Sequence, residues 1–232
     1  TDGDGNPVTE YKNAGVYKAS AKLTAGGNYV LKAETADYIF EIAKKELPVT
    51  WKWDGFTDKA VTYDGGKHAP IGVPTFSGAS GVPDIQPYFV ITDGDGNTLA
   101  DNTKVINAGV YKITYKLRGG DAGNYELKDG EQTFTVKKAA LTVSAENASV
   151  TYGATAPKYN ATFTGFIAAD AAIETQLKAD GMLGQWLICG YVNTTVPGSY
   201  AITVDKQWLA DYLKNYEVSS TDGVLQVTPA AG

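Results

Sequence analysis

The chain has 232 residues, a hydrophobic share of 43% and a formal net charge of −6. That share can build packed cores, which argues against wholesale disorder, and the acidic balance argues against nucleic acid or an anionic lipid surface as a partner. No run of about 18 apolar residues is present, so no membrane-spanning helix is predicted. One histidine and one cysteine leave too few groups for most catalytic triads and metal clusters.

One pattern occurs three times along the chain. Each copy has a small turn and then an alternating strand that begins at Tyr17, Tyr111 or Tyr200. An Asn-Tyr pair and a closing strand follow; the pairs are Asn28-Tyr29, Asn124-Tyr125 and Asn215-Tyr216. The turns at Asn13 and Asn107 are 94 residues apart, which is the length of one small domain.

The repeats predict a domain organisation. Residues 1–46 are the C-terminal half of a module, residues 47–140 form one complete repeat, and residues 141–232 form a second complete repeat. Because Thr1 begins inside a repeat and Gly232 ends just after one, we expect the chain to be a segment of a longer protein.

In the first segment, the sequence from Asp2 to Asn6 predicts a turn. Tyr17 and Leu23 lie at alternate positions from the lysines of the same strand, so the tyrosine set should face a core and the lysines water. A closing strand is predicted over residues 38–42.

The middle segment contains short alternating or β-branched runs separated by turn residues. Tyr111 follows a glycine at the start of its strand, which predicts a tyrosine corner, with the ring inside and the hydroxyl bonded to backbone near the turn. Seven or eight short strands within residues 47–140 predict an all-β, immunoglobulin-like β-sandwich. The predicted strands are Leu47–Trp53, Ala60–Tyr63, Pro74–Ser77, Pro87–Thr92, Lys104–Ile106, Val110–Leu117, Tyr125–Lys128 and Gln132–Lys137.

The last segment repeats this plan with two insertions that read as short helices. Asp170 is expected to cap a helix over 171–179 that stops at Gly181. Asp205 is expected to cap a second helix over 206–214. Such short helices should be stable only when packed on the sheet.

The connections between segments predict a semi-rigid rod. The runs 40–47 and 134–141 pass from a closing strand into an opening strand without Gly or Pro. A flexible linker would be rich in Gly and Ser, whereas a continuous extended segment fixes the angle between neighbours.

Several short motifs recur in the same order in both complete repeats. They include Tyr63-Asp64-Gly65 and Tyr152-Gly153 after an opening strand, then a Gly-Xaa-Tyr strand, the Asn-Tyr pair and a junction leading to Leu141-Thr142-Val143. In this order they resemble the MBG/YDG-type repeats of bacterial extracellular proteins. The resemblance implies tandem, mostly β modules of large surface-anchored or secreted proteins, often called adhesins, with no catalytic residue to transfer. Other bacterial surface repeats adopt a β-grasp fold, and the helix expected near Asp170 keeps that alternative open.

Trp51 and Trp53 are two residues apart and so share a face of their strand. Exposed paired aromatics form stacking platforms for sugars. The equivalent places in the last repeat hold Ala145 and Asn147, and a place that tolerates Asn is not deep core. The pair is therefore the candidate carbohydrate site, although packing at the domain junction is the interpretation that the residues favour.

Asp93, Asp95 and Asn97 alternate with glycines, and alternating oxygen side chains can bind calcium. A full calcium loop needs Gly at its sixth place, where Thr98 stands, and Glu at its twelfth, where Lys104 stands. An Asp-Gly hairpin turn explains the same residues, and the motif recurs at the start of the chain. The sequence favours the turn, and calcium binding is the weaker alternative. No cofactor is expected.

These features predict a noncatalytic spacer or adhesion module of a bacterial cell-surface or secreted protein, located outside the cell and monomeric within a longer chain. The expected partner is a host or cell-surface ligand such as a polysaccharide or glycoprotein. Two alternatives stay open: a carbohydrate-binding accessory segment that uses Trp51 and Trp53, and a noncatalytic segment of a larger secreted enzyme.

Overall fold

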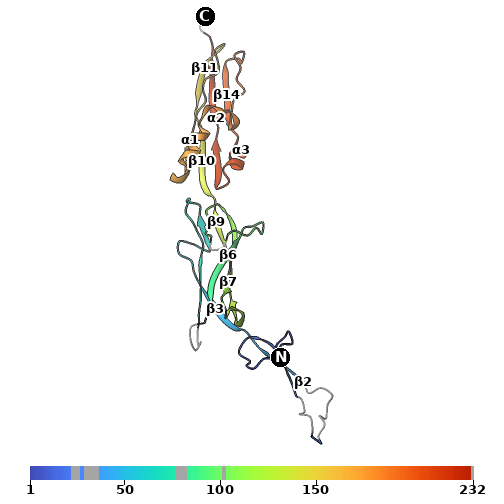
Figure 1. The fold of residues 1–232 in the computed structure, drawn as a ribbon. Helices are drawn as coiled ribbons and strands as arrows, with labels where there is room; N and C mark the ends of the chain where they lie inside the picture. The colour runs from blue at the N-terminus through green and yellow to red at the C-terminus, as the bar shows by residue number, and fades with distance from the viewer. Residues whose placement is uncertain (22–26, 29–36, 77–82, 101–102, 231–232) are drawn as a thin grey trace.

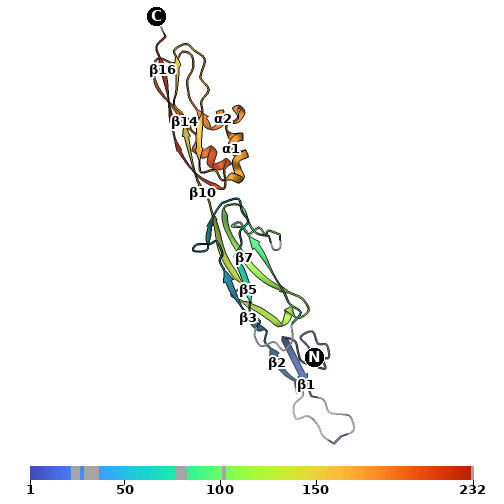
Figure 2. The ribbon, with the colours of Figure 1, turned by 90° about the vertical axis from the view of Figure 1, so that its left-hand side faces the viewer.

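The structure is a computed structural model that describes residues 1–21, 27–28, 37–76, 83–100 and 103–230. The predicted positions Leu23, Tyr29 and Ser77 lie outside these residues. The described residues form an elongated molecule in which three units follow one another, with the C-terminus at the far end of the last (Figure 1). The same order is visible from the side (Figure 2).

The first unit is the N-terminal hairpin, in which β1 (Gly15–Ser20) pairs antiparallel with β2 (Asp37–Ile42). Tyr17 lies opposite Phe40 and Gly15 opposite Ile42. Tyr17 is buried, and its ring stacks on Phe40 with centroids 5.6 Å apart. The predicted core-facing tyrosine and closing strand are therefore both present.

The second unit, here the middle sandwich, has a three-stranded sheet of order β5-β3-β8 and a four-stranded sheet of order β4-β9-β7-β6. A 3₁₀ turn, η1 (Ala122–Asn124), precedes β8. The strands are β3 (Lys45–Lys52), β4 (Ala60–Thr62), β5 (Ile71–Pro74), β6 (Gln86–Thr92), β7 (Gly109–Arg118), β8 (Tyr125–Lys128) and β9 (Glu131–Lys137).

The third unit, the C-terminal sandwich, repeats this topology strand for strand. Its sheets have the orders β12-β10-β15 and β11-β16-β14-β13. The strands are β10 (Ala139–Ala145), β11 (Ala148–Thr151), β12 (Ala161–Thr164), β13 (Leu187–Ile188), β14 (Gly198–Val204), β15 (Tyr216–Thr221) and β16 (Gly223–Thr228).

The pairing of the strands confirms an all-β fold and refines its type. In both sandwiches the opening strand crosses from one sheet to the other: β3 runs parallel to β8 and β4 runs parallel to β9, as β10 does to β15 and β11 to β16. These parallel pairs depart from the antiparallel sheets of the immunoglobulin sandwich. The two sheets of each sandwich also differ from the β-grasp alternative, in which a helix covers a single sheet.

Two predicted strands of the middle sandwich are wrong. The third strand lies at Ile71–Pro74 instead of beginning at Pro74, because its pairing with β3 places Gly72 opposite Trp51. The predicted strand Lys104–Ile106 is only a bridge, in which Val105 exchanges backbone hydrogen bonds of 2.9 and 2.7 Å with His68.

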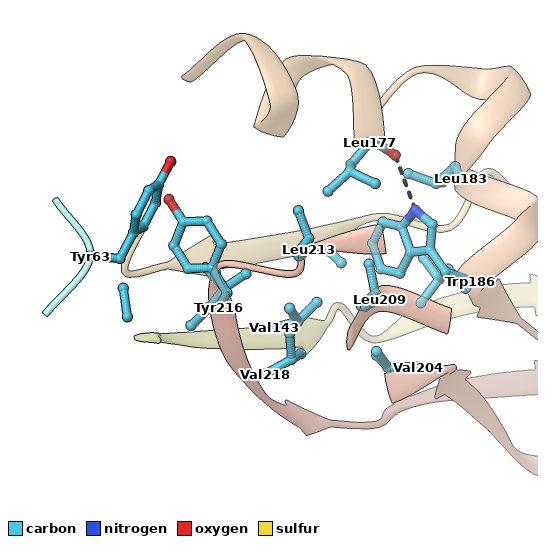
Figure 3. Packing of buried hydrophobic residues seen from close by; sticks show 14 of the residues in the cluster. Tyr63, Val143, Leu177, Leu183, Trp186, Val204, Leu209, Leu213, Tyr216 and Val218 are labelled. Atoms are coloured by element: carbon cyan, nitrogen blue, oxygen red, sulfur yellow. Dashed lines mark hydrogen bonds between the residues drawn. The ribbon is translucent and has the colours of Figure 1, made fainter. Parts of the chain in front are cut away.

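The helices of the C-terminal sandwich occupy places where the middle sandwich has longer strands. α1 (Ala171–Leu177) and α2 (Asp180–Trp186) precede the short β13, and α3 (Lys206–Tyr212) follows β14. Leu177, Trp186 and Leu209 are fully buried. The Trp186 indole N–H donates to the Leu177 carbonyl at 3.2 Å (Figure 3), so α1 and α2 close over the same core.

The predicted helix caps have opposite outcomes. The Asp205 carboxylate accepts from the Trp208 amide at 2.9 Å, which confirms that cap. Asp170 stands at the N-terminus of α1 but makes no capping bond, because its carboxylate binds two tyrosines instead. Gly181 does not stop a helix, since α1 ends at Leu177 and Gly181 lies inside α2.

The tyrosine corner occurs in all three units. Each hydroxyl donates to the carbonyl four residues earlier: Tyr17 to Asn13 at 2.7 Å, Tyr111 to Asn107 at 2.9 Å and Tyr200 to Val196 at 2.8 Å. Gly109 leaves room for the ring, because a Cβ there would lie 3.1 Å from the Tyr111 hydroxyl. Each corner therefore fixes the turn that precedes its strand.

Replacing Tyr111 by Phe removes this hydrogen bond and leaves the Asn107 carbonyl without its partner. We expect the free energy of unfolding of the middle sandwich to fall by about 1 kcal/mol, measured by urea denaturation. Tyr38→Phe is the matched control, because the Tyr38 side chain is 70% exposed. Equal stability of the two variants would contradict a structural role for the corner.

Candidate functional site: the joints between the units

The first joint connects the N-terminal hairpin to the middle sandwich through one asparagine. The Ala14 amide donates to the Asn124 side-chain oxygen at 2.7 Å. The Asn124 side-chain nitrogen donates to the Asn13 side-chain oxygen at 3.1 Å. Because an asparagine amide both accepts and donates, this one side chain holds a whole turn of the neighbouring unit.

The second joint repeats the same two bonds between the middle and C-terminal sandwiches. Ala108 donates to Asn215 at 2.9 Å, and Asn215 donates to the Asn107 side chain at 3.1 Å. We call this pair of bonds the asparagine clasp. The third copy of the turn reads Val196-Pro197, which lacks both the amide side chain and the backbone N–H that the clasp uses.

The second joint has a further contact that buries polar groups. Tyr63, from the middle sandwich, donates to the Asp170 carboxylate at 3.0 Å, and Tyr216 donates to the same oxygen at 2.7 Å. The two rings meet edge to face with centroids 5.7 Å apart and lie side by side in Figure 3. Asp170 is only 9% exposed, so this carboxylate depends on its tyrosine partners.

Burial and the carboxylate shift the ionisation of both tyrosines. Burial raises the pKa of Tyr63 above its ordinary value of 10.0, and the hydrogen bond to Asp170 raises it further. The pKa of Tyr216 is raised by the same two causes in the same order. Both hydroxyls therefore remain protonated, and able to donate, at neutral pH.

Close backbone packing completes the second joint. Gly65 has φ of +78° and ends the Tyr63-Asp64-Gly65 motif, whose counterpart in the last repeat is Tyr152-Gly153. A Cβ at this position would lie 2.9 Å from the Ala169 Cβ, closer than side chains approach one another. Glycine here permits both the turn and the contact between the sandwiches.

The connecting segments are short at both joints. β2 ends at Ile42 and β3 begins at Lys45, while only Lys138 separates β9 from β10. The Ala139 amide also donates to the Asn215 carbonyl at 2.9 Å. The chain thus passes between units as extended backbone.

The candidate carbohydrate residues lie inside the middle sandwich. Trp51 and Trp53 are both half-buried, with centroids 6.2 Å apart. The Trp51 indole donates to the Asp129 carbonyl at 2.8 Å and meets Tyr115 edge to face, and Trp53 meets Phe56 in the same way. The pair packs within one unit and away from the junction; sugar stacking there stays a prediction.

The candidate calcium residues form a compact turn. The Asp93 carboxylate accepts from the amides of Asp95 and Asn97 at 3.0 and 2.8 Å, and from the Asn97 side chain at 3.1 Å. The turn at Asp2 makes the same three bonds with Asp4 and Asn6. Among the described residues no group of three or more His, Cys, Asp or Glu is placed to hold a metal ion.

The comparisons with known proteins agree with the recurring motifs. Residues 141–226 match the family model of the MBG domain (YGX type), which confirms for this part of the chain the resemblance drawn from its sequence. No curated protein and no solved structure matches the chain. In the part of the chain that the structure describes, no helix is long and apolar enough to cross a membrane.

Removing one clasp should open one joint and spare the other. In Asn215→Ala we expect the Ala108 amide to exchange its hydrogen about five-fold faster, because losing one such bond costs about 1 kcal/mol. Native-state hydrogen exchange measures this directly. Asn124→Ala is the matched control and should accelerate only the Ala14 amide. Equal Ala108 exchange in both variants would show that Asn215 does not hold the turn.

Alkaline pH should weaken the second joint. Because the folded pKa values of Tyr63 and Tyr216 are raised, their stabilisation is fully present below pH 10 and is lost as the pH rises through the folded values. The stability advantage of the wild type over Tyr63→Phe should therefore stay constant up to about pH 9 and shrink as the pH rises above about 10 in urea unfolding. The exposed control Tyr38→Phe should differ from the wild type by the same amount at every pH. An equally constant difference for Tyr63→Phe would contradict this linkage.

Proposed function

Because residues 141–226 of the C-terminal sandwich match the MBG domain, we propose that the chain is a noncatalytic spacer or adhesion segment of a bacterial cell-surface or secreted protein. Its units would act mechanically, holding a distal binding part away from the cell at a set distance and angle. The partner we propose is a host or cell-surface ligand such as a polysaccharide or glycoprotein, with the segment monomeric in a longer chain.

One observation carries this proposal: the asparagine clasp occurs at both joints with the same atoms. The bonds from Ala14 and Ala108 differ by only 0.2 Å, at 2.7 and 2.9 Å, and the bonds from Asn124 and Asn215 are both 3.1 Å. A joint built only to connect domains would not need a specific hydrogen-bonded contact. Repetition of that contact favours units that keep a defined orientation.

The chemistry of the surface also supports a mechanical role. The resemblance of residues 141–226 to the MBG domain brings no catalytic residue to this chain. The one histidine, His68, is bound to the Asp64 carboxylate at 2.8 Å in a loop next to the second joint. The net charge of −6 favours a solvated, repulsive surface, which limits self-association of the extended molecule.

Small-angle X-ray scattering of the intact chain tests this proposal. We expect one extended distance distribution, because each clasp and the buried contact at the second joint restrict bending. The double variant Asn124→Ala/Asn215→Ala should broaden that distribution while its far-ultraviolet circular dichroism stays unchanged. A wild type already as broad as the double variant would mean freely hinged units and would refute the semi-rigid rod.

A further inference from the structure

We propose that a groove beside the second joint binds an extended acidic peptide, which adds as a strand to the outer edge of β15. This goes beyond the spacer function, because it gives the side of the rod a ligand. It does not depend on how rigid the joints are.

The groove lies where the connecting segment, α3 and β15 meet. Its volume is about 850 Å³, within the range of about 300–1,000 Å³ that is typical of ligand sites. β15 forms one wall and α3 another. The lining residues are Lys137 of β9, Lys138 of the connection, Ala140 of β10, Lys206 and Ala210 of α3, and residues 216–219 of β15.

The lining is positively charged in a chain that is acidic overall. Lys137, Lys138 and Lys206 are exposed, and no ion pair involves them among the described residues. Glu217 is the one carboxylate in the lining. Nearby on α3, Asp211 pairs with Lys214 at 3.5 Å and also interacts electrostatically with Lys138, from outside the lining. Three lysines facing one carboxylate favour an anionic occupant.

The edge of β15 supplies the backbone part of the site. β15 is the outer strand of the sheet β12-β10-β15, and its inner side pairs with β10. Tyr216 donates its amide to the Leu213 carbonyl at 2.9 Å, but within the described residues no backbone partner lies on the outer side of residues 217–219. Such an edge is a template for another strand.

The groove fits a peptide better than a sugar or a second copy of the chain. Tyr216, its only lining aromatic residue, is 2% exposed and its ring contacts Tyr63 and Phe166, so no face is free for sugar stacking. A second copy would bring its own lysines to the same edge, and like charges oppose that pairing. An acidic strand satisfies both the edge and the lysines.

An equivalent groove in the middle sandwich provides an internal comparison. It lies beside β8, has a volume of about 430 Å³ and includes Lys44, which occupies the place of Lys138. There Lys44 and Lys116 face Glu126 and Glu131, so the charges balance. A groove thus lies at the same place in both sandwiches, but only the larger one, beside β15, has an excess of lysines, and there we place the acidic peptide.

A labelled peptide of alternating Asp and Val, as long as the 6 residues of β15, is the probe, and fluorescence anisotropy with the intact chain is the measurement. We expect Lys138→Gln and Lys206→Gln each to weaken binding by up to about five-fold, the effect of an exposed ion pair. Lys52→Gln, an exposed lysine on β3, is the control and should bind as the wild type does.

Changes in the probe test the backbone contact without disturbing the protein. Replacing Asp by Asn should abolish charge-dependent binding. Two methylated peptides, one for each alternate set of backbone nitrogens, test the two possible registers, and one of them should lose strand addition. The proposal is overturned if the peptide does not bind, if neither lysine variant weakens binding, or if both methylated peptides bind like the parent. Tighter binding of an anionic polysaccharide that displaces the peptide would assign the groove to a glycan instead.

Discussion

The hydroxyl-to-carbonyl bond of the tyrosine corner orders both the units and their connections. Tyr111 holds the Asn107 carbonyl, and the same turn offers the Asn107 side chain and the Ala108 amide to the next unit. The corner at Tyr17 does the same for the clasp of Asn124. Order within a unit and order between units thus share a few backbone atoms, so a change that loosens the strand also loosens the connection.

The two sandwiches share one topology but differ in the lengths of their strands and in their helices. β6 has 7 residues and β7 has 10, whereas β13 has 2 and β14 has 7, and helices fill the difference. The pairing of the tyrosine strand is nevertheless identical, with Gly109 opposite Val136 and Gly198 opposite Val227. The tyrosine strand and its partner are therefore the part of the architecture that the two sandwiches share, and the strands at the edges differ between them.

Local patterns in the sequence predicted the strands that begin at the recurring tyrosines but not the contacts between residues far apart in the sequence. Tyr111 and the cap at Asp205 were predictable, because each depends on neighbours within a few positions. Asp170 looks like an equally good cap, but Tyr63 binds it from 107 positions away in sequence, and no local signal carries that contact. The Asn-Tyr pairs were visible as a repeat, yet their role as a clasp required knowing which turn lies beside them.

Parallel pairing of first and last strands determines how each sandwich would bear tension. The chain enters the C-terminal sandwich through β10, which continues into β11, and it leaves through β16 beside β11. Pulling the two ends apart slides β11 along β16, so the bonds between them share the load and would break together instead of opening one by one. The last sandwich has four such residue pairs, from Ala148 to Thr151, and the middle one has three, from Ala60 to Thr62. The middle unit gains a further bond from the Thr135 amide to the Lys59 carbonyl at 3.0 Å, so the two sandwiches should resist stretching to a similar extent.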